Sequence, residues 1–119
     1  MKTQRVNPSL LQLIDDLKEA SRKHDAPIWK EVAERLEKAR RSWASMNVGK
    51  ISKVLKEGEI ALIPGKVLGD GDITRKFEVA AYQFSRSAVD KISSSGGKAW
   101  TIRDLMAKHP KGTKVRLLR

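Results

Sequence analysis

The spacing of the apolar residues changes once along this chain, near Asn47, and this change limits the folds that the chain can adopt. Before Asn47 the apolar residues recur every three or four positions, as they do on one face of a helix. After it they fall into short runs that glycine interrupts, which is typical of strands and turns. A length of 119 residues suits one compact domain. We therefore predict a single domain over residues 1–119 of mixed α/β class, with a helical hairpin and basic linker at 1–46 and a mixed α/β core at 47–119.

The first part contains two helix starts. A capping residue followed by proline, at 7–8, begins a first helix that ends near His24. Its apolar positions are Leu10, Leu13, Ile14 and Leu17. The Asp-Ala-Pro sequence at 25–27 begins a second helix. Its apolar stripe is Ile28, Val32, Leu36, Ala39 and Trp43. The stripe predicts a helix that ends with the pair Arg40–Arg41, and it favours packing of Trp43 in the core over contact with a nucleic-acid base.

The second part predicts short strands separated by turns. The strands are expected at 48–55, 59–63 and 76–84, with breaks at Pro64-Gly65 and at the Gly-Asp-Gly-Asp sequence 69–72. These pieces are short and broken by glycine. They predict an irregular sheet with glycine turns.

The last third of the chain adds two short helices and a strand. Ser85 begins a helix through Ile92, and Gly96-Gly97 closes it where a left-handed residue is favoured. Thr101 with Asp104 forms a capping-box pattern, which begins a final helix that stops before Pro110. The segment 115–117 can form a closing strand.

The charge of the chain points to a polyanionic partner. Its 25 Lys and Arg against 14 Asp and Glu give a formal charge of +11. Residues 1–44 carry +3 of this charge and residues 45–119 carry +8. No apolar stretch approaches the roughly 20 residues of a spanning helix. Basic residues occur throughout the chain instead of gathering on one amphipathic face, which disfavours a role at a membrane surface. Nucleic acid is therefore the expected partner.

Several patterns of catalytic or metal sites are incomplete in this sequence. The glycine segment 64–72 lacks the Gly-Lys-Ser/Thr of a phosphate-binding loop. Asp70 and Asp72 have no further oxygen ligands at calcium-site spacing, so a turn is favoured over a cation site. His24 and His109 have no second ligand nearby, and the chain contains no cysteine. We therefore predict no catalytic residue, no metal, no cofactor and no disulfide. The first seven residues lack an apolar signal core, which makes the cytoplasm the expected compartment.

The basic residues of the glycine-broken part form the candidate binding set. Arginine can hold phosphate oxygens with two parallel hydrogen bonds, and lysine acts as a mobile point charge. Glycines beside them let backbone amides approach a phosphate. The predicted RNA-binding residues are Arg40, Arg41, Asn47, Gly49, Lys50, Lys53, Lys66, Gly69, Gly71, Arg75, Lys76, Arg86, Lys98, Lys111, Lys114 and Arg116.

Three segments of the chain that contain several of these residues also resemble a known family. They are Asn-Val-Gly-Lys-Ile at 47–51, Pro-Gly-Lys-Val-Leu-Gly-Asp-Gly at 64–71, and Val-Ala-Ala-Tyr-Gln-Phe-Ser-Arg-Ser-Ala at 79–88. Together with the glycine pair at 96–97, they make nearly the whole chain similar to the archaeal and eukaryotic L-eighteen ribosomal proteins, relatives of the bacterial L-fifteen family. The resemblance implies irregular β-β-α units in a superhelix behind a helical pair. The chain departs from the family at 42–43, where Ser-Trp stands in a stretch that often carries proline.

The resemblance implies a structural constituent of the large ribosomal subunit, not an enzyme. Such a protein binds ribosomal RNA and neighbouring ribosomal proteins on the cytoplasmic ribosome, without a membrane, and we expect it to be a monomer off the ribosome. The alternatives are a non-ribosomal RNA chaperone or RNA-processing factor, or a small RNA-modifying enzyme.

Overall fold

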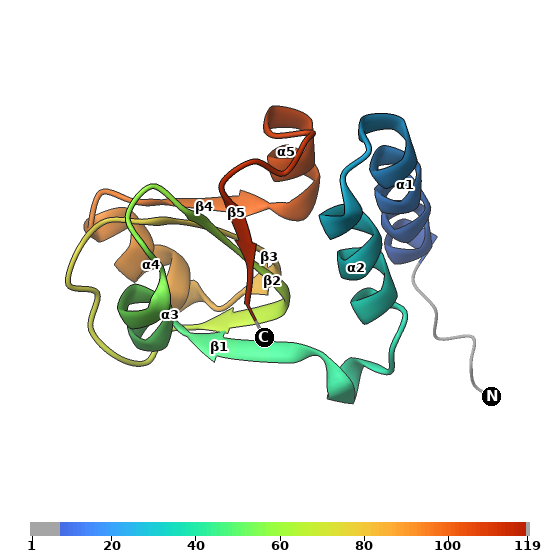
Figure 1. Cartoon of the computed structure of the whole chain (residues 1–119). Helices are drawn as coiled ribbons and strands as arrows, with labels where there is room; N and C mark the ends of the chain where they lie inside the picture. The colour runs from blue at the N-terminus through green and yellow to red at the C-terminus, as the bar shows by residue number, and fades with distance from the viewer. Residues whose placement is uncertain (1–7, 119) are drawn as a thin grey trace.

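A strongly twisted sheet with helices on both faces makes up the computed structural model, which describes residues 8–118 (Figure 1). The mixed α/β class and the N-terminal helical hairpin that the sequence predicts are confirmed. The helices are α1 (Pro8–His24), α2 (Pro27–Leu36), α3 (Val48–Val54), α4 (Arg86–Ser94) and α5 (Ile102–Lys108). The strands are β1 (Ala44–Asn47), β2 (Ile60–Leu68), β3 (Glu78–Phe84), β4 (Lys98–Thr101) and β5 (Val115–Leu117).

Every strand pair in the sheet is parallel, in the order β1-β2-β3-β4. Strand β2 is the centre, because it pairs with β3 on one side and with both β1 and β5 on the other. Strand β5 pairs with residues 60–62 of β2, and β1 pairs with residues 65–68. Residues 69–77 join β2 to β3 without a helix, and α4 follows, which gives a β-β-α succession.

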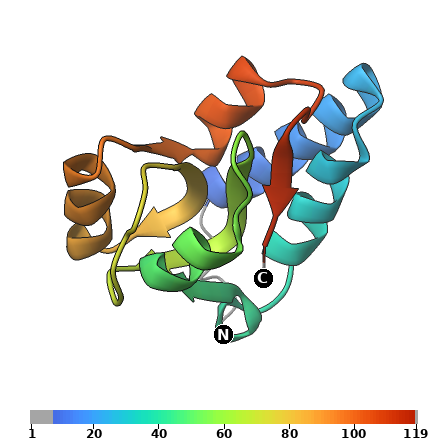
Figure 2. The same ribbon diagram turned by 60° about the vertical axis from the view of Figure 1, so that its left-hand side comes forward.

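The sheet is buried on both faces, as parallel sheets usually are. Successive residues of β2 point to opposite faces: Ile60 and Leu62 pack with α1, α2 and α5, whereas Ala61 and Ile63 pack with α3 and α4. Figure 2 shows the hairpin on one side of the sheet and α3 with α4 on the other. Two apolar clusters therefore share one sheet.

The strand expected at 48–55 is wrong, because this segment forms helix α3. Its buried residues Val48, Ile51, Ser52 and Leu55 recur at intervals of one, three and four positions, which match a helix better than the alternation of a strand. The strands β1 and β4 on either side of this sheet were not predicted. Both have only four residues, so the alternation of burial in β1 is too short to stand out in the sequence, and β4 shows no period of two.

The second helix is also shorter than its apolar stripe suggests. Helix α2 ends at Leu36, and the backbone leaves helical geometry at Ala39, where ψ is 141°. Arg40 and Arg41 lie in a separate 3₁₀ turn, η2 (Arg40–Ser42), and not at the end of α2. Trp43 reaches the core from extended backbone, with its indole Nε1 donating to the Lys38 carbonyl at 2.9 Å.

The expected break at Pro64-Gly65 lies inside β2. The pairing of β2 with β3 shifts register between Ile63 and Lys66, which accommodates a proline that cannot donate a ladder hydrogen bond. Strand β3 begins at Glu78, two residues later than predicted.

The predicted starts and ends in the last third are confirmed. The Ser85 hydroxyl accepts from the Ala88 N–H at 3.2 Å, and the Thr101 hydroxyl accepts from the Asp104 N–H at 3.0 Å. Gly96 follows α4 with a φ of +88°. Strand β5 forms at 115–117 as expected. The proposed cap of the first helix, Asn7, lies outside the described residues.

Candidate nucleic-acid interface

The first group of predicted residues meets where three parallel strands end. In the sheet register Asn47 of β1 lies beside Leu68 of β2, and Phe84 of β3 lies beside Val67. The start of α3, the glycine loop and the start of α4 therefore leave the sheet at one edge.

Close backbone contacts hold the glycine loop against the two helices. The Gly49 N–H donates to the Asp70 carbonyl at 3.0 Å. A Cβ atom on Gly71 would lie 2.7 Å from the Gly49 Cα, and the φ of Gly71 is +92°. A Cβ on Gly69 would lie 2.1 Å from the Ser87 Oγ. At Gly69, close packing leaves no room for a side chain. At Gly71, both the lack of room and the left-handed backbone require glycine.

Exposed cations lie on the elements that flank this loop. Lys50 extends from α3, Lys66 from β2 and Arg86 from the first turn of α4, and all three are exposed. We call the exposed members of this group, Asn47, Lys50, Lys66, Gly71 and Arg86, the carboxyl-end surface, whereas the predicted residues Gly49 and Gly69 are buried. Lys91 belongs beside it and was not predicted, because only the fold brings its Nζ within 3.0 Å of the Gly71 carbonyl.

Asp70 and Asp72 lie on the glycine turn as expected, and both are exposed. Within residues 8–118 no three His, Cys, Asp or Glu side chains gather as metal ligands would. The turn is organised by its backbone, since the Asp70 carbonyl, not its carboxylate, binds Gly49.

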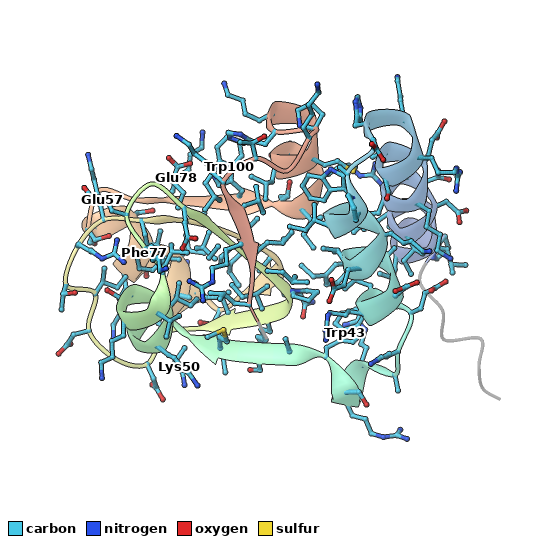
Figure 3. All side chains as sticks on the ribbon, in the orientation of Figure 1. Trp43, Lys50, Glu57, Phe77, Glu78 and Trp100 are labelled. Atoms are coloured by element: carbon cyan, nitrogen blue, oxygen red, sulfur yellow. The ribbon has the colours of Figure 1, made fainter. Side chains whose placement is uncertain are left out.

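The second group lies where the strands begin. A hollow of about 900 Å³ opens beside the starts of β2, β3 and β4. We call it the amino-end hollow. The cations that line it are Lys56, Arg75, Lys76, Lys98 and Lys114. They come from four separate segments of the chain, so only folding brings them together. Figure 3 shows Glu57, Phe77 and Glu78 on this side of the molecule.

Two of the acidic residues that line this hollow form hydrogen bonds or ion pairs within the protein. Glu59 accepts from the Lys56 N–H at 2.9 Å and pairs with Arg116 at 3.4 Å, and these contacts, the backbone hydrogen bond first, lower the pKa of its carboxyl group. Glu78 accepts from the Trp100 indole at 2.8 Å. Their negative charge is thus partly satisfied within the protein.

Four predicted cations make specific contacts of their own. The Lys98 Nζ lies 4.1 Å from the centre of the Trp100 ring. Arg75 donates to the Ser52 carbonyl at 3.4 Å, and Arg116 donates to the Val54 carbonyl at the same distance. Arg40 stacks on Trp43. The remaining predicted cations outside both groups are exposed: Arg41, Lys53 and Lys111.

Ion pairs concentrate on the hairpin side of the molecule. Lys18 pairs with Glu37 at 2.7 Å, which raises the pKa of the Lys18 ammonium group. Asp16 pairs with Arg103 at 2.7 Å, and hydrogen bonding to Arg103 lowers the pKa of the Asp16 carboxyl group. Arg35 pairs with Glu31. In the predicted binding set, by contrast, only Arg116 forms an ion pair with another residue in the range 8–118.

Comparison with known proteins decides the family. The model of the family described as ribosomal protein 60S L18 and 50S L18e matches residues 2–119. The chain belongs to this L18 family. Its relatives include large ribosomal subunit protein eL18 of Archaeoglobus fulgidus, which is 51% identical over 94% of this chain and 96% of the relative. The eL18 protein of Methanopyrus kandleri is 47% identical over 94% of this chain and 92% of its own length. That of Methanosphaerula palustris is 45% identical over 99% and 98%.

Membership of the L18 family confirms the resemblance that the three motif segments indicated. The family consists of structural ribosomal proteins, so the prediction that this L18-family chain is not an enzyme is confirmed as well. None of the helices described has both the length and the apolar character needed to cross a bilayer.

Proposed function

We propose that this chain is a structural component of the large ribosomal subunit that binds ribosomal RNA through the carboxyl-end surface, the amino-end hollow and the η2 arginines. The family supports the ribosomal role, since its curated relatives are named large ribosomal subunit proteins. The remaining predicted residues, Lys53, Lys111 and Arg116, are exposed charges, of which Arg116 pairs with Glu59.

The distribution of paired and unpaired cations supports the RNA contact most strongly. Two cations of the hairpin, Lys18 and Arg35, pair with carboxylates at 2.7 and 3.2 Å, whereas the cations of the carboxyl-end surface, the amino-end hollow and η2 form no ion pair with residues 8–118. Each phosphate that such a cation neutralises releases counterions, which favours binding. A-form RNA presents mainly phosphates and 2′-hydroxyls to a protein, so a surface of dispersed cations suits it better than a pocket of convergent groups.

The two groups also suggest how the protein acts. One lies where β1, β2 and β3 end and the other where β2, β3 and β4 begin, so the protein can contact RNA at both ends of its sheet. Binding of this kind holds RNA segments in place without chemistry. Neighbouring ribosomal proteins complete the surroundings on the cytoplasmic ribosome, and off the ribosome we expect a monomer.

Sedimentation in high salt tests this function. A tagged chain expressed in an archaeal host should travel with the large subunit through a gradient that strips loosely bound proteins. The purified chain should also lose affinity for large-subunit RNA by orders of magnitude over a few-fold increase in salt. Release from the subunit at high salt together with a flat salt dependence would contradict the proposal and favour a free RNA-processing factor.

A further inference from the structure

Two aromatic rings and an arginine form a fixed cluster beside η2. The rings of Trp43 and Tyr82 meet edge to face, with centroids 5.1 Å apart and planes at 74°. The Arg40 guanidinium carbon lies 4.9 Å from the Trp43 ring centre and 5.4 Å from that of Tyr82. The bond from Trp43 Nε1 to the Lys38 carbonyl fixes the indole. We call these three residues the Arg40 cluster. In Figure 3, Trp43 lies on the hairpin side, well away from Lys50 of the carboxyl-end surface.

The cluster holds positive charge that no carboxylate balances. Neither Arg40 nor its exposed neighbour Arg41 forms an ion pair with any part of the chain that the structure describes. An aromatic ring attracts a cation without cancelling its charge. A guanidinium group held in this way has lost part of its rotational freedom before any ligand arrives, so less entropy is lost on binding. It is therefore prepared to bind an anionic group.

A hollow of about 400 Å³ lies against the same tyrosine. Its floor is apolar and comes from three elements: Leu13 of α1, Ala81 of β3 and Ile102 of α5. Tyr82 forms an aromatic wall, and Gln12 lies on the polar rim. Among residues 8–118, the one cation that lines it, Arg103, is already paired with Asp16. We call this space the Tyr82 hollow. An aromatic wall, an apolar floor and a polar rim suit a planar heterocycle with hydrogen-bonding edges.

We propose that the Arg40 cluster and the Tyr82 hollow together bind a single unpaired nucleotide of RNA. The base enters the hollow and stacks on Tyr82, and the flanking phosphates bind Arg40 and Arg41. This site rests on the proposed RNA-binding function and adds a preference that dispersed cations alone do not give. A base-paired nucleotide does not fit, because its faces are covered by its neighbours in the duplex. An acidic protein segment would satisfy the arginines and leave the hollow empty.

Two RNA hairpins that differ only by one bulged adenosine test the site with the full chain. The wild-type protein should bind the bulged hairpin roughly fivefold or more tightly than the fully paired one, because stacking of one base on an aromatic side chain has about this effect or a larger one. Tyr82→Ala should remove the preference while the fully paired hairpin keeps most of its affinity.

A second variant guards against loss of folding in Tyr82→Ala. Gln12→Trp places a bulky side chain at the rim of the hollow from an exposed position, and it should abolish the preference with an unchanged melting temperature. The matched control is Leu11→Trp, the adjacent position on α1, which is 51% exposed and does not line the hollow. The control should keep the preference.

The outcomes separate this proposal from the proposed function. Equal binding of both hairpins by the wild type, with the usual salt dependence, would overturn the nucleotide site and leave RNA binding intact. If Leu11→Trp and Gln12→Trp both lose the preference for the bulged hairpin, that preference does not come from the Tyr82 hollow. Absence of salt-dependent binding to either hairpin would overturn both ideas.

Discussion

At the scale of single residues, two kinds of position carry specific roles. The first is the contact between Gly71 and Gly49, where two backbones meet closely enough to exclude any side chain. The second is Arg40, whose guanidinium contacts two aromatic rings, whereas no ring contact is seen for Arg41 among the residues described. Neighbouring residues of the same type can therefore differ in their effects, and substitution can measure the difference.

Substitution of the loop glycines should damage folding more than substitution of the aspartate between them. Gly71→Val forces a β-branched residue into a left-handed backbone, and Gly69→Val places a side chain on Ser87. Each should lower the free energy of unfolding by about 2 kcal/mol or more. Asp70→Asn retains the backbone carbonyl that binds Gly49 and should remain close to wild type. Urea denaturation measures all three. Normal stability of both valine variants, with loss of RNA binding in Asp70→Asn, would indicate a carboxylate or metal role instead.

The η2 arginines should contribute unequally to RNA affinity. Arg40→Ala removes a guanidinium that the rings hold in position, so it should weaken binding more than Arg41→Ala, which removes a mobile one. Loss of the cation–π contact should cost roughly 0.5–1 kcal/mol of stability in Arg40→Ala. The double variant should lower the slope of affinity against salt by about one to two. Titration of large-subunit RNA at several salt concentrations measures these effects, and an unchanged slope would show that the pair serves only the turn.

At the scale of elements, local signals predict helix ends well and strand identity poorly. Ser85 and Thr101 cap helices as their side chains suggested, because a cap depends on residues only three positions apart. The segment 48–54 forms a helix instead of the predicted strand, and strand β1 before it was missed because its pairing with residues 65–68 of β2 is distant in sequence. Trp43 was assigned to α2 because its spacing fits, yet its ring packs on Tyr82 from outside the helix.

For the candidate site, too, the sequence predicts local features well and long-range arrangement poorly. The sequence predicts which residue types bind RNA, since arginine, lysine and glycine can be identified without a fold. It does not predict their grouping: Lys76, Lys98 and Lys114 share one hollow because the starts of parallel strands meet. Lys91 and Tyr82 were not among the predicted residues. Tyr82 lies in the motif at 79–88, but only packing places the two side chains beside the groups described above.

Removal of the cap of α4 tests the contribution of a contact between residues close in sequence. Ser85→Ala should lower the free energy of unfolding by about 1 kcal/mol, because the Ala88 N–H loses its side-chain acceptor. Ser93→Ala, at an exposed position in the same helix, is the matched control and should be nearly neutral. Thermal denaturation followed by circular dichroism compares the two. Equal effects of the two substitutions would show that the hydrogen bond to Ala88 contributes little.

At the scale of the whole molecule, one sheet joins two apolar clusters. Strand β2 supplies Ile60 and Leu62 to the hairpin side and Ala61 and Ile63 to the side of α3 and α4. If either cluster came apart, one apolar face of the shared strand β2 would be exposed to water. We therefore propose that residues 1–46 and 47–119 unfold together as one domain.

A single transition is the expected result in urea. Tryptophan fluorescence reports on Trp29, Trp43 and Trp100, which all pack in the cluster on the hairpin side, and it should give the same midpoint as far-ultraviolet circular dichroism, which follows all the helices. Both signals should also yield the same slope against urea. A fluorescence midpoint at lower urea than the circular dichroism midpoint would show that the hairpin side unfolds separately.

Crosslinking of the chain to RNA within the large subunit, followed by sequencing of the RNA and mass spectrometry of the attached peptides, tests the central claim most directly. The attached RNA should be large-subunit ribosomal RNA. The attached residues should fall in the carboxyl-end surface, the amino-end hollow and the η2 segment, where cations have no carboxylate partner among the residues described. Crosslinks confined to the ion-paired surface of α1 and α2, or crosslinks to other cellular RNA alone, would contradict this account.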